Sequence, residues 1–189
     1  MDIVRFEPRF LETAGRLIYE TDRQLFDLFF KNPEVALEKL LRNGVCWDPE
    51  RIIVASSEGE ILGVLAYEID NSKSGVLDLI RKLGPGDSLR VIMMDLIDSL
   101  STQRVEDGDL YIASLAVAPE ARGQGVGFRL LQEAQMIAED RGLDRLTLDV
   151  SPTNTPALNL YSRFGFRLKG EKEIRILKRR FQQMELPLH

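Results

Sequence analysis

The sequence predicts a single α/β domain over residues 1–189, and three observations carry this prediction. Residues 110–150 run as an apolar strand, an amphipathic helix and a second apolar strand, which is the pattern of a βαβ unit with parallel strands. Strand and helix patterns continue on both sides of this unit without a repeat, a low-complexity tract or a linker. The 189 residues, 44% hydrophobic and 29% charged, are enough for one sizeable core.

The first half of the chain alternates strand and helix patterns. From the apolar periodicity and the Pro and Gly positions, we expect strands and helices in this order: strand 3–6, helix 10–18, helix 22–30, helix 34–41, strand 51–56 and strand 61–69. Residues 71–108 then form a helical insertion. Two amphipathic helices, 76–83 and 89–100, are predicted there, separated by the breaker 84–86.

The second half has the clearer pattern. An apolar, partly β-branched strand covers 110–117, and a loop over 118–127 ends in glycines. The apolar residues of the helix that follows share one face: Leu130, Leu131, Ala134, Ile137 and Ala138. A strand over 145–150 completes the βαβ unit, with Gly142 as the expected helix C-cap. A turn, a short helix at 157–164 and closing strands at 166–169 and 181–186 end the chain.

The rare residues and the charge exclude several classes of function. Cys46 is the only cysteine and His189 the only histidine, which argues against a disulfide scaffold, a Ser-His-Asp triad and a zinc site. Any acid–base chemistry must therefore use carboxylates, tyrosine, lysine, serine, backbone or water. A net charge of -5 is unfavourable for binding nucleic acid or an anionic membrane over a broad face. Without a targeting or membrane-spanning pattern, we expect a reduced, cytoplasmic protein.

The most specific segment is the glycine-rich turn at residues 122–127, Arg-Gly-Gln-Gly-Val-Gly, between a strand and a helix. Glycines allow positive φ and a close approach of the backbone to a ligand. The first turn of the following helix presents N–H groups without intrahelical partners at the positive end of its dipole. Together these features favour a phosphate or pyrophosphate site over a plain strand–helix turn.

Three kinds of phosphate ligand are compatible in principle with a turn of this composition. A Walker A loop is excluded, because Phe128 and Arg129 follow where Lys and Ser or Thr are required. A dinucleotide site is disfavoured, because the glycine spacing is GxGxG, residues 118–122 separate it from the strand, and no second nucleotide-binding half is present. Coenzyme A, which carries a pyrophosphate and an extended arm, is the third candidate.

At this point the residues resemble a known family. Residues 115–127 resemble motif A of the GCN5-related N-acetyltransferase (GNAT) family, and residues 154–161 with 164–166 resemble its motif B. The motif region is similar to that of ribosomal-protein-alanine N-acetyltransferases, and the likeness runs from Leu110 to Leu168. It implies one GNAT-like domain with a mixed central sheet flanked by helices, into which the helical segment 71–108 is inserted between two sheet strands.

The resemblance also implies acetyl-CoA as co-substrate and no metal. In the family, the strand of motif A pairs with the pantetheine amides, the glycine turn holds the pyrophosphate, and the Asn of motif B contacts the pantetheine arm. The residues that match these roles are Leu115, Ala116, Val117, Arg122, Gly123, Gln124, Gly125, Val126, Gly127, Phe128 and Asn154.

The catalytic roles fall on Tyr161 and Asp149. Tyr161 matches the family's general acid, although spacing alone would favour a half-buried helix aromatic. Asp149 stands where the ribosomal-protein enzymes have Glu, and its shorter side chain favours a water relay to the amine; the alternative is a solvated acid at a strand end. Other carboxylates considered for the base are Glu68, Glu106 and Asp109.

The sequence therefore predicts an acetyl-CoA-dependent N-acetyltransferase that transfers an acetyl group directly to a primary amine. The acceptor stays open between a protein N-terminus or lysine and a small molecule such as a polyamine. The alternatives are a non-catalytic acyl-CoA-binding sensor and, less favoured, a nucleotide-binding regulator. The insertion at 71–108 either caps the acceptor site or forms a homodimer contact.

Overall fold

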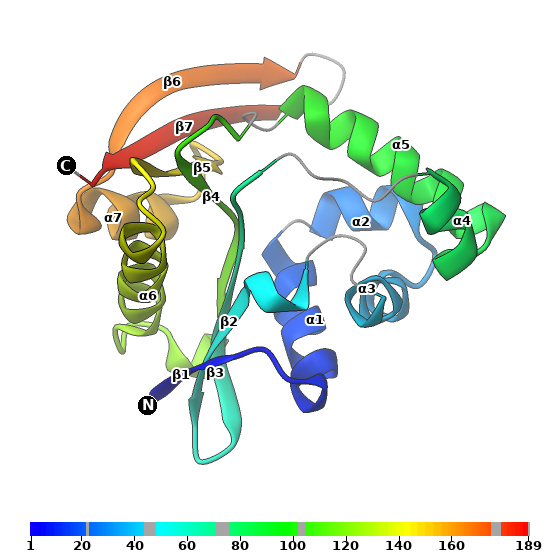
Figure 1. The fold of residues 1–189 in the computed structure, drawn as a ribbon, viewed down its shortest axis with the longest axis horizontal. Helices are drawn as coiled ribbons and strands as arrows, with labels where there is room; N and C mark the ends of the chain where they lie inside the picture. Colours follow the sequence, from blue (N-terminus) through cyan, green and yellow to red (C-terminus); the bar gives the residue numbers. More distant parts are fainter. Residues whose placement is uncertain (22, 44–47, 71–75, 102–104, 175–178, 189) are drawn as a thin grey trace.

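A seven-stranded mixed sheet forms the centre of the protein, with strand order β1-β2-β3-β4-β5-β7-β6. The computed structural model describes residues 1–189 except 22, 44–47, 71–75, 102–104, 175–178 and 189. Only β4 and β5 pair in parallel, and the other neighbouring strands are antiparallel. Helices cover both faces of the sheet (Figure 1). The predicted α/β class and mixed central sheet are confirmed.

The strands, in chain order, are β1 (Asp2–Arg5), β2 (Ile52–Ser57), β3 (Glu60–Glu68), β4 (Asp109–Val117), β5 (Arg145–Val150), β6 (Arg167–Ile174) and β7 (Arg179–Pro187). The α-helices are α1 (Leu11–Thr21), α2 (Arg23–Phe29), α3 (Pro33–Arg42), α4 (Val76–Leu83), α5 (Pro85–Ser101), α6 (Val126–Asp140) and α7 (Thr155–Phe164). Short 3-10 turns at Pro8–Phe10, Pro49–Arg51 and Pro119–Ala121 precede α1, β2 and the glycine-rich turn.

Helices α6 and α1 pack on opposite faces of the central part of the sheet. Helix α6 packs on one face against β2, β3, β4 and β5, and α1 packs on the other against β3 and β4. Figure 1 shows α6 and α7 on one side and α1, α2 and α3 on the other. The predicted apolar face of α6 is buried as expected, with Leu130 and Leu131 fully inside the core. This packing fixes both ends of the β4–α6 turn.

The insertion between β3 and β4 contains the two predicted helices, α4 and α5. Helix α5 begins at Pro85, four residues before the predicted start, because proline is well suited to the first helical position, where its missing N–H is not needed. Helix α5 packs against α2 and β6. An ion pair between Lys39 Nζ and Asp87 Oδ2, at 2.6 Å, also joins it to α3. The insertion therefore lies against its own domain, on the α1–α3 side (Figure 1).

The closing strands are longer than predicted. β6 extends to Ile174 and β7 begins at Arg179, where the two pair with each other. The added residues are largely charged, so apolar periodicity could not reveal them; the hairpin partner stabilises them through backbone hydrogen bonds. Cys46 and His189, which served to exclude a disulfide, a triad and zinc, lie outside the described residues.

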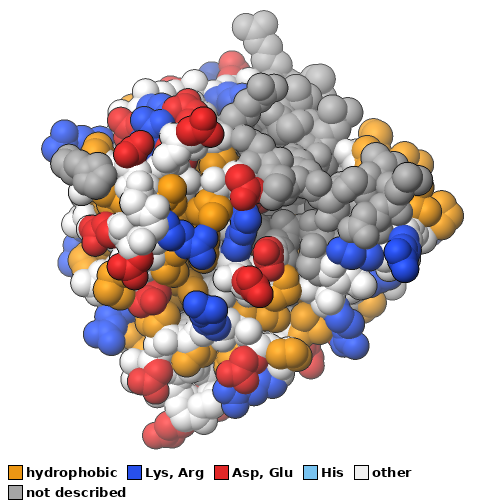
Figure 2. Space-filling view, in the orientation of Figure 1, with side chains coloured by type: hydrophobic (Ala, Val, Ile, Leu, Met, Phe, Trp, Pro, Cys, Tyr) orange, Lys and Arg blue, Asp and Glu red, His pale blue; other side chains and the backbone are white. Residues whose placement is uncertain are grey.

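Two observations concern the helices and one face of the molecule. No helix in the described ranges is long and apolar enough to cross a membrane. Figure 2 shows basic and acidic side chains interspersed over the displayed side of the molecule, rather than gathered by sign.

A buried carboxylate holds the first residues of β4 and β5 together. Asp109 is 1% exposed and accepts a hydrogen bond from Arg145 Nε, and Arg145 Nη2 also lies 2.6 Å from Glu106 Oε2. We expect Asp109→Asn to lower the free energy of unfolding by about 1–3 kcal/mol, because it leaves the Arg145 charge without its buried partner. Urea unfolding measures this, with Glu60→Gln on the exposed start of β3 as control. Equal stability of the two variants would contradict the structural role of the pair.

Candidate active site

The central strands separate where the site forms. β4 pairs with β5 only from Asp109 opposite Arg145 to Ile112 opposite Leu148, although β4 continues to Val117. On its other side β4 has a bulge at Ala113, since Ala66 pairs with Ser114 and Tyr67 with Ile112. A bulge bends and twists the strand. The second half of β4 therefore turns its β5-facing edge to a gap instead of to a neighbouring strand.

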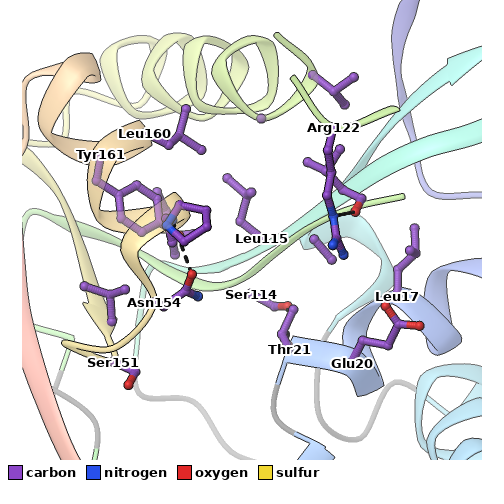
Figure 3. Close-up of a pocket in the computed structure, with 18 of the residues that line it drawn as sticks. Leu17, Glu20, Thr21, Ser114, Leu115, Arg122, Ser151, Asn154, Leu160 and Tyr161 are labelled. Carbon is purple, nitrogen blue, oxygen red and sulfur yellow. Dashed lines mark hydrogen bonds between the residues drawn. The ribbon is translucent and has the colours of Figure 1, made fainter. Parts of the chain in front are cut away.

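A cavity of about 570 Å³ occupies this gap. Its walls come from α1, β4, the glycine-rich turn, the end of β5, the start of α7 and Phe181 of β7. In the view of Figure 3, Tyr161 and Asn154 lie toward one end, Arg122 and Glu20 toward the other, with Leu115 between them. Elements far apart in the sequence thus meet around one elongated space.

The glycine-rich turn is built from two left-handed residues. Gly123 has φ +76° and Gly125 has φ +81°, a region that L side chains rarely adopt. A Cβ placed on either residue would meet no described atom within 4 Å, and both residues line the cavity. Both glycines therefore adopt a positive φ and leave open space beside the backbone, so that an anion could approach the main-chain amides.

Helix α6 begins directly at this turn. Arg129 makes the first helix-type hydrogen bond, to the Gly125 carbonyl at 3.0 Å, so the amides of residues 126–128 precede it. No side chain caps the helix, and its N-cap is Gly125. Unpaired amides at the positive end of a helix dipole favour an anion. This corrects one boundary: the predicted loop ended at Gly127, but Gly127 and Phe128 belong to the first turn of α6.

Gly127 has a packing role that differs from that of the other two glycines. A Cβ on it would lie 2.9 Å from Leu160 Cδ2, so a larger residue would require the Leu160 side chain on α7 to shift. Arg122 is exposed, and its Nε donates to the Val117 carbonyl at 3.2 Å, which ties the turn to the end of β4. Both contacts hold the turn against the cavity wall.

Nine of the eleven expected cofactor-binding residues line the cavity: Leu115, Ala116, Val117, Arg122, Gly123, Gly125, Val126, Gly127 and Asn154. Gln124 and Phe128 do not. Gln124 donates to the Glu120 carbonyl at 2.8 Å, and the Phe128 ring contacts Phe164 edge-on with 4.9 Å between centroids. Asn154 caps α7, its Oδ1 accepting from Ala157 N at 3.3 Å, and this leaves its NH₂ group as a donor.

Tyr161 lies on α7, 7% exposed, and lines the cavity. Its ring contacts Phe166 edge-on at 5.7 Å, and within the described part of the chain no residue hydrogen-bonds its hydroxyl. Burial raises the pKa of Tyr161 to about 12, because the phenolate would lose its hydration. At neutral pH the hydroxyl therefore remains protonated and can act as a donor.

This pKa has a measurable consequence. Because the phenol stays protonated well below its pKa of about 12, we expect no loss of kcat from Tyr161 ionisation between about pH 8 and about pH 10. A pH–rate profile at saturating substrates measures this, with spontaneous thioester hydrolysis subtracted at each pH. A decline in kcat with an apparent pKa near the ordinary tyrosine value would contradict the assignment.

Asp149 lines the same cavity from β5 and is half-buried. Its Oδ2 accepts a hydrogen bond of 3.3 Å from the hydroxyl of Tyr111 on β4, a residue that the sequence did not single out. The structure thus brings both predicted catalytic residues, Asp149 and Tyr161, to one cavity.

The other carboxylates considered for the base lie elsewhere. Glu106 and Asp109 are engaged with Arg145 at the opposite end of β4, and neither lines the cavity. Glu68, at the end of β3, is also absent from the lining. The structure therefore leaves Asp149 as the only one of the four at the site.

Sequence reasoning missed the α1 wall of the cavity. Leu17, Glu20 and Thr21 line it, and Thr21 Oγ1 lies 3.2 Å from Ser114 Oγ on β4 (Figure 3). These contacts join residues almost a hundred positions apart, and no local pattern signals them. Glu20 is a second carboxylate in the lining, in addition to Asp149.

These features were compared with known proteins. The profile described as "Acetyltransferase (GNAT) family" matches residues 22–166, well over half of the chain. The chain belongs to the GNAT acetyltransferase family. This confirms the resemblance seen in the two motifs. The crystal structure of an N-acetyltransferase from Staphylococcus aureus Mu50 has a similar fold, with a TM-score of 0.69 at 19% identity over 98% of this chain and 100% of that one.

Curated relatives match this GNAT chain over shorter stretches. Streptothricin acetyltransferase of Streptomyces lavendulae is 41% identical over 61 residues, 32% of this chain and 32% of that protein. A Bacillus subtilis (strain 168) protein, provisionally named a ribosomal protein bS18-alanine N-acetyltransferase, is 37% identical over 62 residues, 33% of this chain and 41% of that protein. The matched segments thus span less than half the length of either relative.

Proposed function

We propose that this protein is an acetyl-CoA-dependent N-acetyltransferase that acts on a primary amine by direct transfer. The observation that carries the proposal is the cavity between β4 and β5, which joins an anion-binding turn at one end to a buried, protonated tyrosine and a carboxylate at the other. Family membership supports the donor, and the residues of the turn fit its chemistry.

The donor site uses backbone more than side chains. The amides at the start of α6, with Gly123 and Gly125, are placed to receive a diphosphate, and the free edge of β4 beyond Ile112 can pair with pantetheine amides as an added strand would. The NH₂ group of Asn154 offers a further donor to the arm. When bound, the donor supplies an activated acetyl thioester.

Amide formation requires a free amine. An alkylammonium must lose a proton before its nitrogen can attack the thioester carbon, and Asp149 is the carboxylate at the cavity that can accept this proton, directly or through water. The nitrogen lone pair then forms the new C–N bond as the C–S bond breaks, and the nitrogen releases its second proton to solvent, which leaves a neutral amide. Because the amine attacks the thioester itself, no protein nucleophile is needed.

Tyr161 serves the leaving group. The departing thiolate takes the phenolic proton of Tyr161, and the phenol regains a proton from solvent before the next turnover. Its burial beside Phe166 keeps the hydroxyl protonated for this step. The acceptor is a peptide or a small molecule with a primary amine, and the Asp149 carboxylate in the lining favours a cationic acceptor.

A coenzyme A-release assay tests this function. The chain is supplied with acetyl-CoA and a panel of N-terminal peptides, lysine peptides, polyamines, amino acids and aminoglycosides. We expect thiol release above the rate without acceptor for at least one class, with the acetylated amine identified by mass spectrometry. Tight acetyl-CoA binding without release for any class would instead support the acyl-CoA sensor.

A further inference from the structure

The register between β4 and β5 places Tyr111 in a defined relation to Asp149. Tyr111 pairs with Thr147 in parallel, so Asp149 is the diagonal neighbour two residues further along β5, on the same sheet face. Tyr111 is 6% exposed, and its hydroxyl reaches Asp149 Oδ2 at 3.3 Å. The phenol therefore extends diagonally past Thr147 to the carboxylate. Both Tyr111 and Asp149 line the cavity.

The two tyrosines of the cavity have different environments. The Tyr111 hydroxyl donates to a carboxylate, whereas the Tyr161 hydroxyl bonds to no residue in the described ranges. A hydroxyl has a single proton to donate. Tyr111 Oη lies at hydrogen-bond distance from Asp149 Oδ2, whereas the Tyr161 proton remains for the leaving group.

We propose that Tyr111 is a positioning residue for the general base: its hydroxyl holds the Asp149 carboxylate in one orientation at the cavity wall. The inference rests on the proposed function, in which Asp149 accepts the amine proton. That proton moves from the ammonium to Asp149 while the proton of Tyr111 stays in place. Asp is one methylene shorter than Glu, so its reach is limited and its orientation matters more.

Other titratable groups lie on the same sheet face or elsewhere in the cavity lining. Among the described residues, Glu185 on β7 lies on the same face, opposite Thr147, and Tyr161 and Glu20 line the cavity from α7 and α1. None of these changes in Tyr111→Phe, which removes one oxygen and keeps the ring. A shift in the pH profile of this variant therefore reports the lost hydrogen bond.

Tyr111→Phe is compared with Thr147→Val, its neighbour on the same face. We expect Tyr111→Phe to lower kcat on the order of 10-fold with unchanged acetyl-CoA affinity, since a bond of 3.3 Å is longer and weaker than most. The acid limb of kcat/KM should move to higher pH, because a lost donor to the charged carboxylate raises its pKa. Thr147 Oγ1 is buried and has no hydrogen-bond partner, so Thr147→Val should keep full activity and stability.

A double-mutant cycle with Asp149→Asn completes the test. If Tyr111 acts through Asp149, adding Tyr111→Phe to Asp149→Asn should lower kcat no further. An unchanged kcat and acid limb in Tyr111→Phe, or fully additive losses, would overturn the inference. Full activity of Asp149→Asn would also overturn it while leaving the acetyltransferase function intact, whereas absence of turnover in the wild type would end both.

Discussion

Tyr161→Phe is expected to lower kcat by about 100- to 10,000-fold while leaving the affinity for acetyl-CoA unchanged. The variant removes the Tyr161 hydroxyl, which is the protonated donor that α7 contributes to the cavity. General acid catalysis contributes rate factors of about this size. The ring stays, so its edge-on contact with Phe166 is preserved. Initial rates give kcat, and calorimetry gives the dissociation constant.

Tyr67→Phe is the matched control for this change. Tyr67 is buried on β3 and does not line the cavity. Tyr67→Phe therefore shows how much turnover changes when a buried tyrosine away from the site loses its hydroxyl. We expect wild-type turnover in Tyr67→Phe. If Tyr161→Phe also turned over at the wild-type rate, the leaving thiolate would take its proton elsewhere and the role of Tyr161 would be disproved.

Gly125→Val should weaken acetyl-CoA binding by about 10-fold or more. Gly125 has φ +81° at the start of α6, and its Cβ direction opens to space beside the cavity. A β-branched residue is strained at this φ and would place methyl groups beside the amides that receive the diphosphate. The dissociation constant from calorimetry measures the effect.

Gly142→Val separates backbone strain from ligand exclusion. Gly142 follows α6 at its other end with φ +66°, also with no described atom within 4 Å of a Cβ, and it does not line the cavity. Both variants should lose similar stability in thermal melts, but only Gly125→Val should lose donor affinity. Equal donor affinity in the two variants would show that the turn does not contact the donor.

Apolar periodicity and glycine spacing predict the helices and turns that short stretches of sequence determine. The apolar face of α6 and the three glycines of the turn are visible in sequence, and the structure gives the glycines two distinct reasons: positive φ at Gly123 and Gly125, and close helix packing at Gly127. The sequence places the start of α6 too late, because glycine-rich residues are typical of loops, whereas the helix begins at Val126. Phe128 accordingly packs on Phe164 outside the cavity lining.

The parts that sequence reasoning missed depend on contacts between distant segments. Neither the α1 wall nor the bond from Tyr111 to Asp149 has a signal in either segment alone, because register decides which residues meet. The same applies to Glu106 and Asp109. As isolated carboxylates they were candidates for the base, and only the position of Arg145 assigns them to a structural ion-pair network.

Titration with acetyl-CoA and with S-acetyl-pantetheine tests the central claim most directly, that main-chain amides after β4 bind the diphosphate of the donor. We predict saturable binding of acetyl-CoA at one site per chain and at least about 10-fold weaker binding of S-acetyl-pantetheine, which lacks the diphosphate together with the adenosine 3′-phosphate attached to it. Equal affinity for the two compounds, or no heat from acetyl-CoA at about millimolar concentration, would contradict the account.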